Sequence, residues 1–243
     1  MRTAEARISA NQRIAEEIWC MKLDTDLCAE AECGQFLQVQ VPGFYLRRPI
    51  SICRCGKDYA VIVYKVVGDG TRAMSEMKEG ETVSLFGPLG TPFPVEDRDV
   101  LLIGGGVGVP PLLETAYRYR AKGRNVTAVL GSADAASLIL EDEFRALGCR
   151  VYTATMDGSK GTKGTVLDAV KENGITETFV LSCGPLGMLK GVSEAYTDGY
   201  VSLEARMACG MGACMGCVVK SRDGGSLRVC KDGPVFRIGE AVL

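Results

Sequence analysis

Apolar and polar residues alternate along the first part of the chain, and this alternation predicts β-strands. Residues 35–41 (QFLQVQV) alternate, residues 59–67 (YAVIVYKVV) are β-branched and aromatic, and residues 81–90 (ETVSLFGPLG) end in turn residues. Side chains with a period of two lie on opposite faces of a strand, and Val, Ile, Tyr and Phe favour that geometry. Short strands separated by Gly and Pro predict a small antiparallel barrel. One short helix over 70–80, with Thr71 as its N-cap, is expected to interrupt them.

The pattern changes after Asp99, where wholly apolar runs alternate with amphipathic ones. Strands are expected in DVLLI, NVTAVLGS, CRVYTATMDG and TFVLSCGP, and helices in PPLLETAYRYRAKG, SLILEDEFRALG, TVLDAVKENG and PLGMLKGVSEAYTDG. A strand buried on both faces loses the polar positions of an amphipathic strand, which is typical of parallel sheets covered by helices. This part of the chain is therefore expected to form a doubly wound parallel α/β sheet.

The last forty or so residues differ again. They hold four cysteines, followed by VVKSRDGGSLRVC, which predicts a hairpin with its turn at residues 223–225. So short a segment buries little core of its own, and a metal centre is the usual substitute. The chain is therefore expected to be multidomain, β plus α/β, with divisions at 1–98, 99–199 and 200–243.

Composition narrows the chemistry. The net charge of −2 gives no reason to expect nucleic acid or an anionic membrane as a partner. No apolar run approaches the roughly 20 residues of a membrane span, and the N-terminus lacks the apolar region of a secretion signal, so a cytoplasmic location is expected. The chain has no histidine, which excludes Ser–His and Cys–His triads and histidine-ligated metals. Its 11 cysteines are an odd number without an export signal, which argues against a disulfide framework.

Four of the cysteines have a spacing with chemical meaning. Cys209, Cys214, Cys217 and Cys230 follow the pattern C-x4-C-x2-C-x12-C, whose first part is the plant-type [2Fe–2S] spacing. The glycines between them let a loop wrap tightly and turn its amides toward sulfur. Structural zinc is the alternative, but zinc sites more often show two separated C-x2-C pairs. The other seven cysteines have no comparable spacing and are expected to be inert small apolar residues.

Two glycine turns mark the α/β region. LLIGGGVGVPP places four glycines between a strand and a helix: Gly104, Gly105, Gly106 and Gly108. A helix N-terminus behind glycines suits a pyrophosphate, although Val109 stands where the dinucleotide fingerprint requires its last glycine. A phosphate site and a plain tight turn therefore both remain open.

The second turn, LSCGP, contains Cys183, Gly184 and Pro185. Ligands of open α/β sheets bind beyond the carboxyl ends of the strands, so both turns are expected to face one crevice. Cys183 is then either a soft group beside a ligand or a small buried residue.

The barrel carries a third set of candidate ligand-binding residues. In RRPIS (47–51), an arginine and a hydroxyl flank a proline and could grip a phosphate and a ring atom, or simply form a charged strand end. In GDGT (68–71), a Gly–Thr pair opens the expected helix, which is another natural phosphate cradle.

Taken in order, RRPIS, VYK, GDGT, GPLG, GGGVGVPP and SCGP resemble the segments of ferredoxin reductase-like flavoproteins over roughly residues 10–200. The ending SLEARMACGMGACMGCVVK…RVCKDGPVF narrows the likeness, and the whole chain resembles the electron-transfer subunit of class 1B dihydroorotate dehydrogenase. This resemblance implies an FAD-binding β-barrel (1–98), an NAD-binding α/β domain (99–199) and a [2Fe–2S] domain (200–243).

The resemblance also implies the positions of the cofactors. FAD would be held by Arg48, Pro49, Ile50, Ser51, Val63, Tyr64, Lys65, Gly70 and Thr71. The cluster ligands would be Cys209, Cys214, Cys217 and Cys230. NAD, as substrate, would lie across the turns at 104–108 and 183–185, with Cys183 the one candidate for a group near the nicotinamide.

These three centres form a coherent series. Nicotinamide gives up two electrons as a hydride, an iron–sulfur cluster accepts one, and a flavin can stand between them.

After the second strand of the sheet, GSADAASLIL offers no Arg or Lys to a 2′-phosphate, and Asp134 would repel one. The sequence therefore favours NAD over NADP.

No segment resembles a dihydroorotate site or an FMN-binding barrel. The resemblance implies that the dihydroorotate chemistry of pyrimidine (UMP) biosynthesis lies on an FMN-containing catalytic partner, commonly in a heterotetramer of two chains of each kind. Met207, Met211 and Met215 either contact that partner or pack the small domain's own core. A related reductase subunit serving a hydrogenase or a ferredoxin:NADP transhydrogenase is the alternative, and a zinc-stapled nucleotide sensor is a more distant one.

Overall fold

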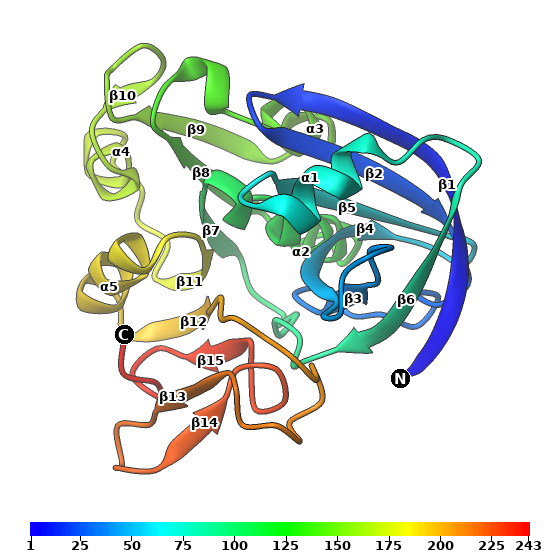
Figure 1. Cartoon of the computed structure of the whole chain (residues 1–243). Coiled ribbons are helices and arrows are strands. Elements are labelled where there is room, and N and C mark those ends of the chain that lie inside the picture. The colour runs from blue at the N-terminus through cyan, green and yellow to red at the C-terminus, as the bar shows by residue number, and fades with distance from the viewer.

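The computed structural model describes residues 1–243 as three regions arranged around a common junction (Figure 1). The first region is a closed antiparallel barrel with strand order β1–β2–β5–β4–β3–β6. Its strands are β1 (Arg2–Ala15), β2 (Ile18–Asp24), β3 (Phe36–Val39), β4 (Arg48–Cys55), β5 (Tyr59–Lys65) and β6 (Thr82–Leu89). Alternate side chains such as Ile8, Leu37 and Ile62 fill its interior, which confirms the predicted barrel.

The short helix that interrupts the barrel is α1 (Asp69–Glu76), which packs on the barrel through the fully buried Met74. The prediction of Thr71 as its N-cap was wrong, because Gly68 occupies that position. Thr71 lies three residues into the helix, and its hydroxyl accepts hydrogen bonds from the N–H groups of Val67 (2.9 Å) and Gly68 (3.2 Å). The threonine therefore closes the first turn from inside the helix.

The second region is a seven-stranded sheet with order β10–β9–β8–β7–β11–β12–β15, in which the first six strands are parallel. The parallel strands are β7 (Val100–Gly105), β8 (Val126–Ser132), β9 (Arg150–Thr155), β10 (Thr162–Lys163), β11 (Phe179–Cys183) and β12 (Asp198–Ser202). The helices are α2 (Pro110–Ala121), α3 (Glu141–Ala146), α4 (Val166–Glu172) and α5 (Leu186–Ala195).

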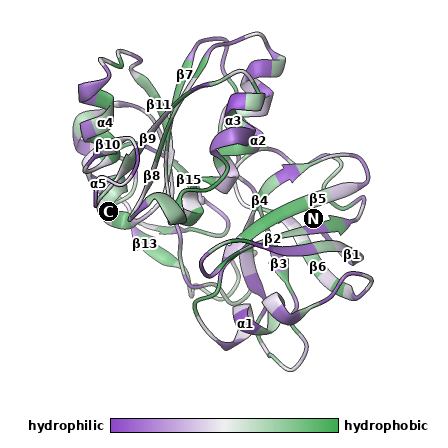
Figure 2. Ribbon diagram, turned by 90° about the horizontal axis from the view of Figure 1, so that it is seen from above, coloured by the Kyte–Doolittle hydropathy of each residue, from purple (hydrophilic) through white to green (hydrophobic).

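Both faces of this sheet are covered, as a doubly wound sheet requires. Figure 2 shows α2 and α3 on the face toward the barrel, and α4 and α5 on the other face. Neighbouring residues of β7 serve opposite sides: Leu102 belongs to the core beneath α2, and Leu101 and Ile103 to the core beneath α4 and α5. The helix expected over 137–148 is shorter than predicted, because Leu140 has a left-handed backbone (φ 63°) that a right-handed helix cannot include.

The last region is built onto the other two. The hairpin β13 (Val218–Lys220) and β14 (Ser226–Arg228) encloses residues 223–225, as predicted. β15 (Val235–Arg237) pairs antiparallel with β12 and so extends the sheet of the second region. The expected division at 199/200 falls within β12. A shared core joins Val229 and Phe236 to Leu89 of the barrel and Val201 of the sheet, so the short segment draws its packing from both neighbours.

A buried ion-pair network fixes the barrel against the sheet. Glu114 of α2 is 1% exposed, and its carboxylate lies 3.0 Å from Arg54 Nε of β4 and 2.9 Å from Arg118 Nε. The N–H of Cys55 also donates to it at 3.4 Å. The network holds barrel and sheet at a fixed separation, and the cavity described below opens between them.

No helix of the structure has both the length and the apolar character that a bilayer crossing demands.

Candidate functional site

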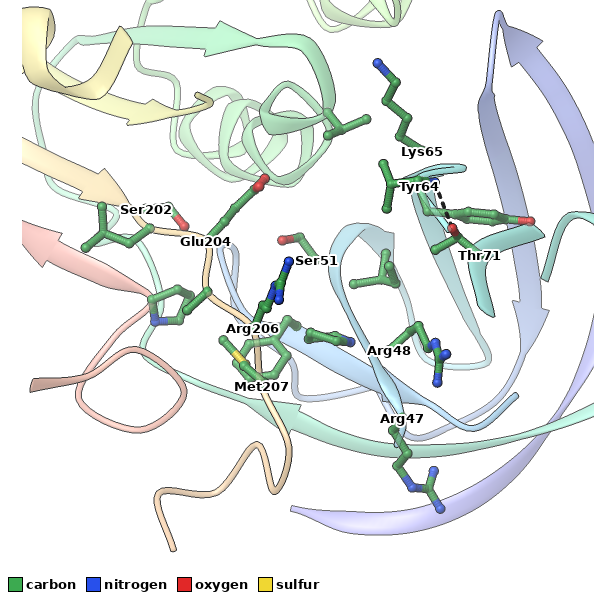
Figure 3. Close-up of a pocket in the computed structure, with 18 of the residues that line it drawn as sticks. Arg47, Arg48, Ser51, Tyr64, Lys65, Thr71, Ser202, Glu204, Arg206 and Met207 are labelled. Carbon is green, nitrogen blue, oxygen red and sulfur yellow. Dashed lines mark hydrogen bonds between the residues drawn. The ribbon is translucent and has the colours of Figure 1, made fainter. Parts of the chain in front are cut away.

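A cavity of ≈ 890 Å³ opens where the three regions meet (Figure 3). β4 and β5 form one wall, and the segment that follows β12 forms the opposite wall. Nine of the predicted site residues line it: Arg48, Pro49, Ile50, Ser51, Val63, Tyr64, Lys65, Thr71 and Cys183. Its size lies within the range of cofactor pockets, roughly 300–1,000 Å³. The barrel motifs therefore converge on a single site.

Gly70 is the predicted barrel residue that does not line the cavity, and its role is to make room. A Cβ at this position would lie 2.1 Å from Nε of Arg48, closer than any real contact. The guanidinium of Arg48 stacks 4.5 Å from the Phe44 ring and donates a hydrogen bond to the carbonyl of Leu46. No carboxylate pairs with Arg48, so its charge remains available to an anion in the cavity.

The neighbouring Arg47 has a different function. Its guanidinium donates to the carbonyls of Gln38 at 3.3 Å and Ser84 at 3.0 Å, and so braces β3 and β6. The Tyr64 hydroxyl is likewise occupied, because it donates to Asn11 Oδ1 at 3.0 Å. Burial raises the pKa of Tyr64 to about 12, so the phenol stays protonated. Among the predicted barrel residues, Arg48 has no carboxylate partner, and the side chains of Ser51 and Lys65 have no hydrogen-bond partner.

The opposite wall was not predicted from the sequence. It consists of Ser202, Leu203, Glu204, Ala205, Arg206 and Met207, which lead directly into the cysteine loop. Glu204 faces open space in the cavity but lies deep among protein atoms, and this burial raises its pKa. Its one sequence signal was its position, between the end of a sheet strand and the first cysteine.

Cys183 is 2% exposed, which satisfies both interpretations of it, as a small buried residue and as part of a ligand cavity. Burial, and then the charge of Glu204, raise its thiol pKa to about 12, so the group stays a neutral thiol.

Of the six other cysteines outside the loop, Cys20 is half-buried and Cys28, Cys33, Cys53, Cys55 and Cys149 are buried. Burial raises the thiol pKa in each, as expected of inert residues.

A second cavity of ≈ 460 Å³ lies at the carboxyl ends of the parallel strands. Gly105, Gly106 and Pro185 line it, so the two glycine turns do face one crevice. No charged side chain lines it. Asp134 is outside, and its carboxylate accepts the N–H of Ser137 at 2.9 Å.

The remaining turn residues lie behind this crevice. Gly104, Gly108 and Gly184 line neither cavity, and Cys183 belongs to the first one. A Cβ on Gly108 would lie 2.3 Å from the carbonyl oxygen of Cys183. Because Gly108 has no side chain, the two turns can pack directly against each other.

The cysteine loop directs backbone amides at sulfur. Burial alone would raise the pKa of Cys209, but N–H groups of Met211, Cys214 and Ala213, at 3.5, 3.4 and 3.3 Å, lower it to about 6. The N–H of Gly212 donates to Cys230 Sγ at 3.2 Å, and the N–H of Cys230 to Cys217 Sγ at 3.4 Å. Amide donors of this kind stabilise thiolates and cluster sulfur.

The four sulfurs do not surround one point. No three Cys, Asp or Glu side chains of the chain converge on the position of a single metal ion. The loop therefore shows the donor chemistry of an iron–sulfur site, with thiols and inward amides, but does not display a closed mononuclear site. Cys217 and Cys230 are buried together, and Cys214 is exposed. Burial and the proximity of Cys217 raise the pKa of Cys230.

Two contacts join this loop to the first cavity. Met207 lines the cavity, and Cys209 follows two residues later. The buried Gln38 of β3 donates from Nε2 to the carbonyl of Ala208 at 3.2 Å. The loop is thus fixed to the barrel strand beside the strand that carries Ser51.

Known proteins match the chain in two parts and as a whole. Residues 204–242 match the family profile described as the iron-sulfur cluster binding domain of dihydroorotate dehydrogenase B, and residues 102–194 match the oxidoreductase NAD-binding domain. The chain is 44% identical to a Streptococcus thermophilus protein named dihydroorotate dehydrogenase B (NAD(+)), electron transfer subunit, over 97% of both chains. A Bacillus mycoides protein of the same name is 42% identical over 97% of both.

A solved structure is also similar over nearly the whole chain. It is an NADH-dependent reduced ferredoxin-NADP oxidoreductase described in connection with flavin-based electron bifurcation, 32% identical with a TM-score of 0.90. The similarity covers 98% of this chain and 90% of that one. The barrel, the sheet and the cysteine-bearing end therefore occur together in that protein as well.

Proposed function

This chain belongs to the family of dihydroorotate dehydrogenase B electron transfer subunits, and from that membership we propose that it carries electrons between NAD and a separate FMN-containing catalytic subunit. One observation carries the proposal. A single segment, residues 202–209, forms a wall of the large cavity and ends at the first cysteine of the loop. A flavin site and a cluster site would thus share one piece of backbone, which would keep the two centres of a relay near each other.

The residues of the large cavity fit FAD. Arg48, beside the N-terminus of α1, would hold the pyrophosphate, because its cation has no carboxylate partner. Pro49, Ile50 and Val63 provide an apolar surface for the ring, and Ser51 a hydroxyl at its edge. When bound, FAD accepts electrons in pairs and releases them singly.

The second cavity would hold NAD as substrate. Gly105 and Gly106 bring bare backbone to the carboxyl ends of the strands, where α/β sheets bind nucleotides. A 2′-phosphate would meet no Arg or Lys among the lining residues, which supports NAD rather than NADP. Cys183 connects the turn of this cavity to the first one, and is the candidate for a group near the nicotinamide.

The cysteine loop would hold the [2Fe–2S] cluster through Cys209, Cys214, Cys217 and Cys230. Gly212 and Ala213 already direct N–H groups at two of these sulfurs. Such hydrogen bonds tune cluster potential, so the loop would supply tuning as well as ligands.

The partner would dock near the exposed side of the loop, in an assembly of two chains of each kind. Met211 is 45% and Met215 54% exposed there, whereas Met207 packs into the shared core. Replacing Met211 and Met215 by Ser is expected to weaken assembly with the cognate catalytic subunit in size-exclusion chromatography. Ile14→Ser, at an exposed barrel position, is the control. Assembly equal to that of the control would exclude this docking surface.

The test of the whole proposal uses the complex with the cognate catalytic subunit. Dihydroorotate, added anaerobically, should bleach the flavin and cluster absorption of the complex and support NAD reduction. The 32% identity to the ferredoxin-NADP oxidoreductase makes that activity the second candidate. Turnover with reduced ferredoxin and NADP, in the absence of dihydroorotate-linked turnover, would favour it.

The location that we propose is the cytoplasm. None of the 11 cysteines forms a disulfide, which fits a reducing compartment.

A further inference from the structure

Four cations line the large cavity, and none of them has a carboxylate partner: Arg47, Arg48, Lys65 and Arg206. Arg47 and Arg48 donate to backbone carbonyls, whereas the exposed side chains of Lys65 and Arg206 form no hydrogen bond. Of these last two, Lys65 points away from Ser51 and Glu204 in Figure 3. Figure 3 shows Arg206 pointing into the space near Ser51 and Glu204. An unpaired charge held in a cavity by a short segment indicates a ligand of opposite charge.

The cavity has two chemically distinct ends. Arg48 and Thr71, with the N-terminus of α1, lie on one side in Figure 3. Ser51, Glu204 and Arg206 lie on the other. Ser202 pairs with Cys183 in the sheet, so the segment that carries Arg206 starts beside the turn between the two cavities. Arg206 therefore lies at the end nearer the nucleotide cavity.

The two ends suit different parts of FAD. Arg48 and the helix N-terminus would hold the pyrophosphate, because they match its charge. The ring would then be held at the other end, toward the nucleotide cavity from which a hydride is supplied. A hydride brings two electrons and one proton, so reduction would add one negative charge at that end. At that end Arg206 is the cation beside Ser51, and Glu204 is the one carboxylate that lines the cavity.

We propose that Arg206 tunes the redox potential of FAD, by placing its guanidinium against the charge that the ring acquires on reduction and not against the pyrophosphate. This inference rests on the proposed function, since it requires FAD in the large cavity. A cation near the ring favours the reduced form and raises the flavin potential. The same segment reaches Cys209 three residues later, so one stretch of chain sets the flavin potential and begins the cluster loop.

The test compares Arg206→Gln and Arg206→Lys with Arg48→Gln in the full chain carrying FAD and cluster. The readouts are the flavin midpoint potential against a reference dye, and the dissociation constant of FAD by fluorescence. Arg206→Gln should lower the ratio of reduced to oxidised flavin at fixed potential about tenfold, ~30 mV for a two-electron couple. Its FAD affinity should change little, and Arg206→Lys should keep most of the potential. Arg48→Gln should show the reverse, with weakened FAD binding and an unchanged potential.

Three results would overturn the inference. Weak FAD binding with an unchanged potential in Arg206→Gln would make Arg206 a phosphate ligand. Unchanged values of both quantities in Arg206→Gln would leave it without a role. A potential in Arg206→Lys as low as that in Arg206→Gln would contradict a charge effect. If the glutamine form does not fold, an Arg206→Lys potential about 30 mV below the wild-type value would contradict it in the same way. A wild-type chain that binds no FAD would overturn the proposed function itself, and its spectrum distinguishes that case.

Discussion

The barrel–sheet junction and the cysteine loop are stabilised by different means. The junction buries a continuous apolar core, in which Cys53 and Val63 of the barrel meet Leu112 and Ala116 of α2, around the carboxylate of Glu114. The loop has Cys214 and Met215 exposed, and is shaped by left-handed residues and amide–sulfur contacts. The junction is complete without a ligand, whereas the loop arranges groups whose chemistry calls for one. Each of the following predictions tests this difference.

The largest effect is expected in the loop. Cys217→Ser should abolish the cluster, and lower electron transfer to the partner by more than the 10–100-fold that loss of an outer-shell partner costs. NADH oxidation by an artificial dye should persist, because the FAD cavity does not include Cys217. Iron and sulfide content, the visible spectrum and dye reduction check this. Cys20→Ser is the control and should keep the cluster; loss of dye reduction in Cys217→Ser would show that the two regions depend on each other.

The next effect is expected at the junction. Glu114→Ala leaves Arg54 and Arg118 without their shared carboxylate, and should cost about 3–5 kcal/mol of unfolding free energy in a urea titration. The matched control is the exposed pair of Arg2 and Asp26, where Arg2→Ala should cost less than about 1 kcal/mol. Equal costs for the two variants would mean that the buried network does not stabilise the junction.

A smaller effect is expected where the two turns touch. Gly108→Ala places a methyl group 2.3 Å from the Cys183 carbonyl oxygen, so the turns must move apart, at a cost of about 1–3 kcal/mol and with weaker NAD binding. Gly123→Ala meets no atom within 4 Å and bears only the left-handed penalty (φ 75°), about 1 kcal/mol or slightly more. Its NAD affinity should be unchanged. Thermal unfolding and NADH titration separate the two, and normal NAD binding in Gly108→Ala would contradict the close packing of the turns.

The smallest effect concerns pH. The pKa of Glu204 is raised by burial, so the folded chain holds its proton at pH values where the unfolded chain has lost it. Stability should therefore fall as pH rises from the ordinary value near 4.5 toward the raised folded value. Glu204→Gln removes this dependence, and the difference in Tm between the variant and the wild type should grow with pH through that window. A constant difference would show that Glu204 titrates normally. Glu194→Gln is the control.

Residues close in sequence carried the predictions of local chemistry. Four cysteines at C-x4-C-x2-C-x12-C indicated an iron–sulfur site through their spacing, whereas the barrel motifs from Arg48 to Thr71 became a prediction of FAD binding only through the resemblance to ferredoxin reductase-like flavoproteins. The barrel and the doubly wound sheet were predictable for the same reason, since burial on one face or on two determines the period of apolar residues. The errors were also local. Leu140 shortened a helix through its backbone angle, and Thr71 acted from inside the turn it was expected to cap.

The tertiary structure determined which residues, far apart in the sequence, face one another. Glu204 and Arg206 had no motif to identify them, and became cavity residues because β12 pairs with β11 and delivers the following segment opposite Ser51. β15 joined the sheet, and Glu114 joined two arginines, through contacts that span many residues. Sequence spacing records which groups a short loop can bring together, but not which distant segments the burial of a shared core will place against it. By itself, the sequence determined the kinds of site in this protein, and the packing of three regions on one another determined how those sites are connected.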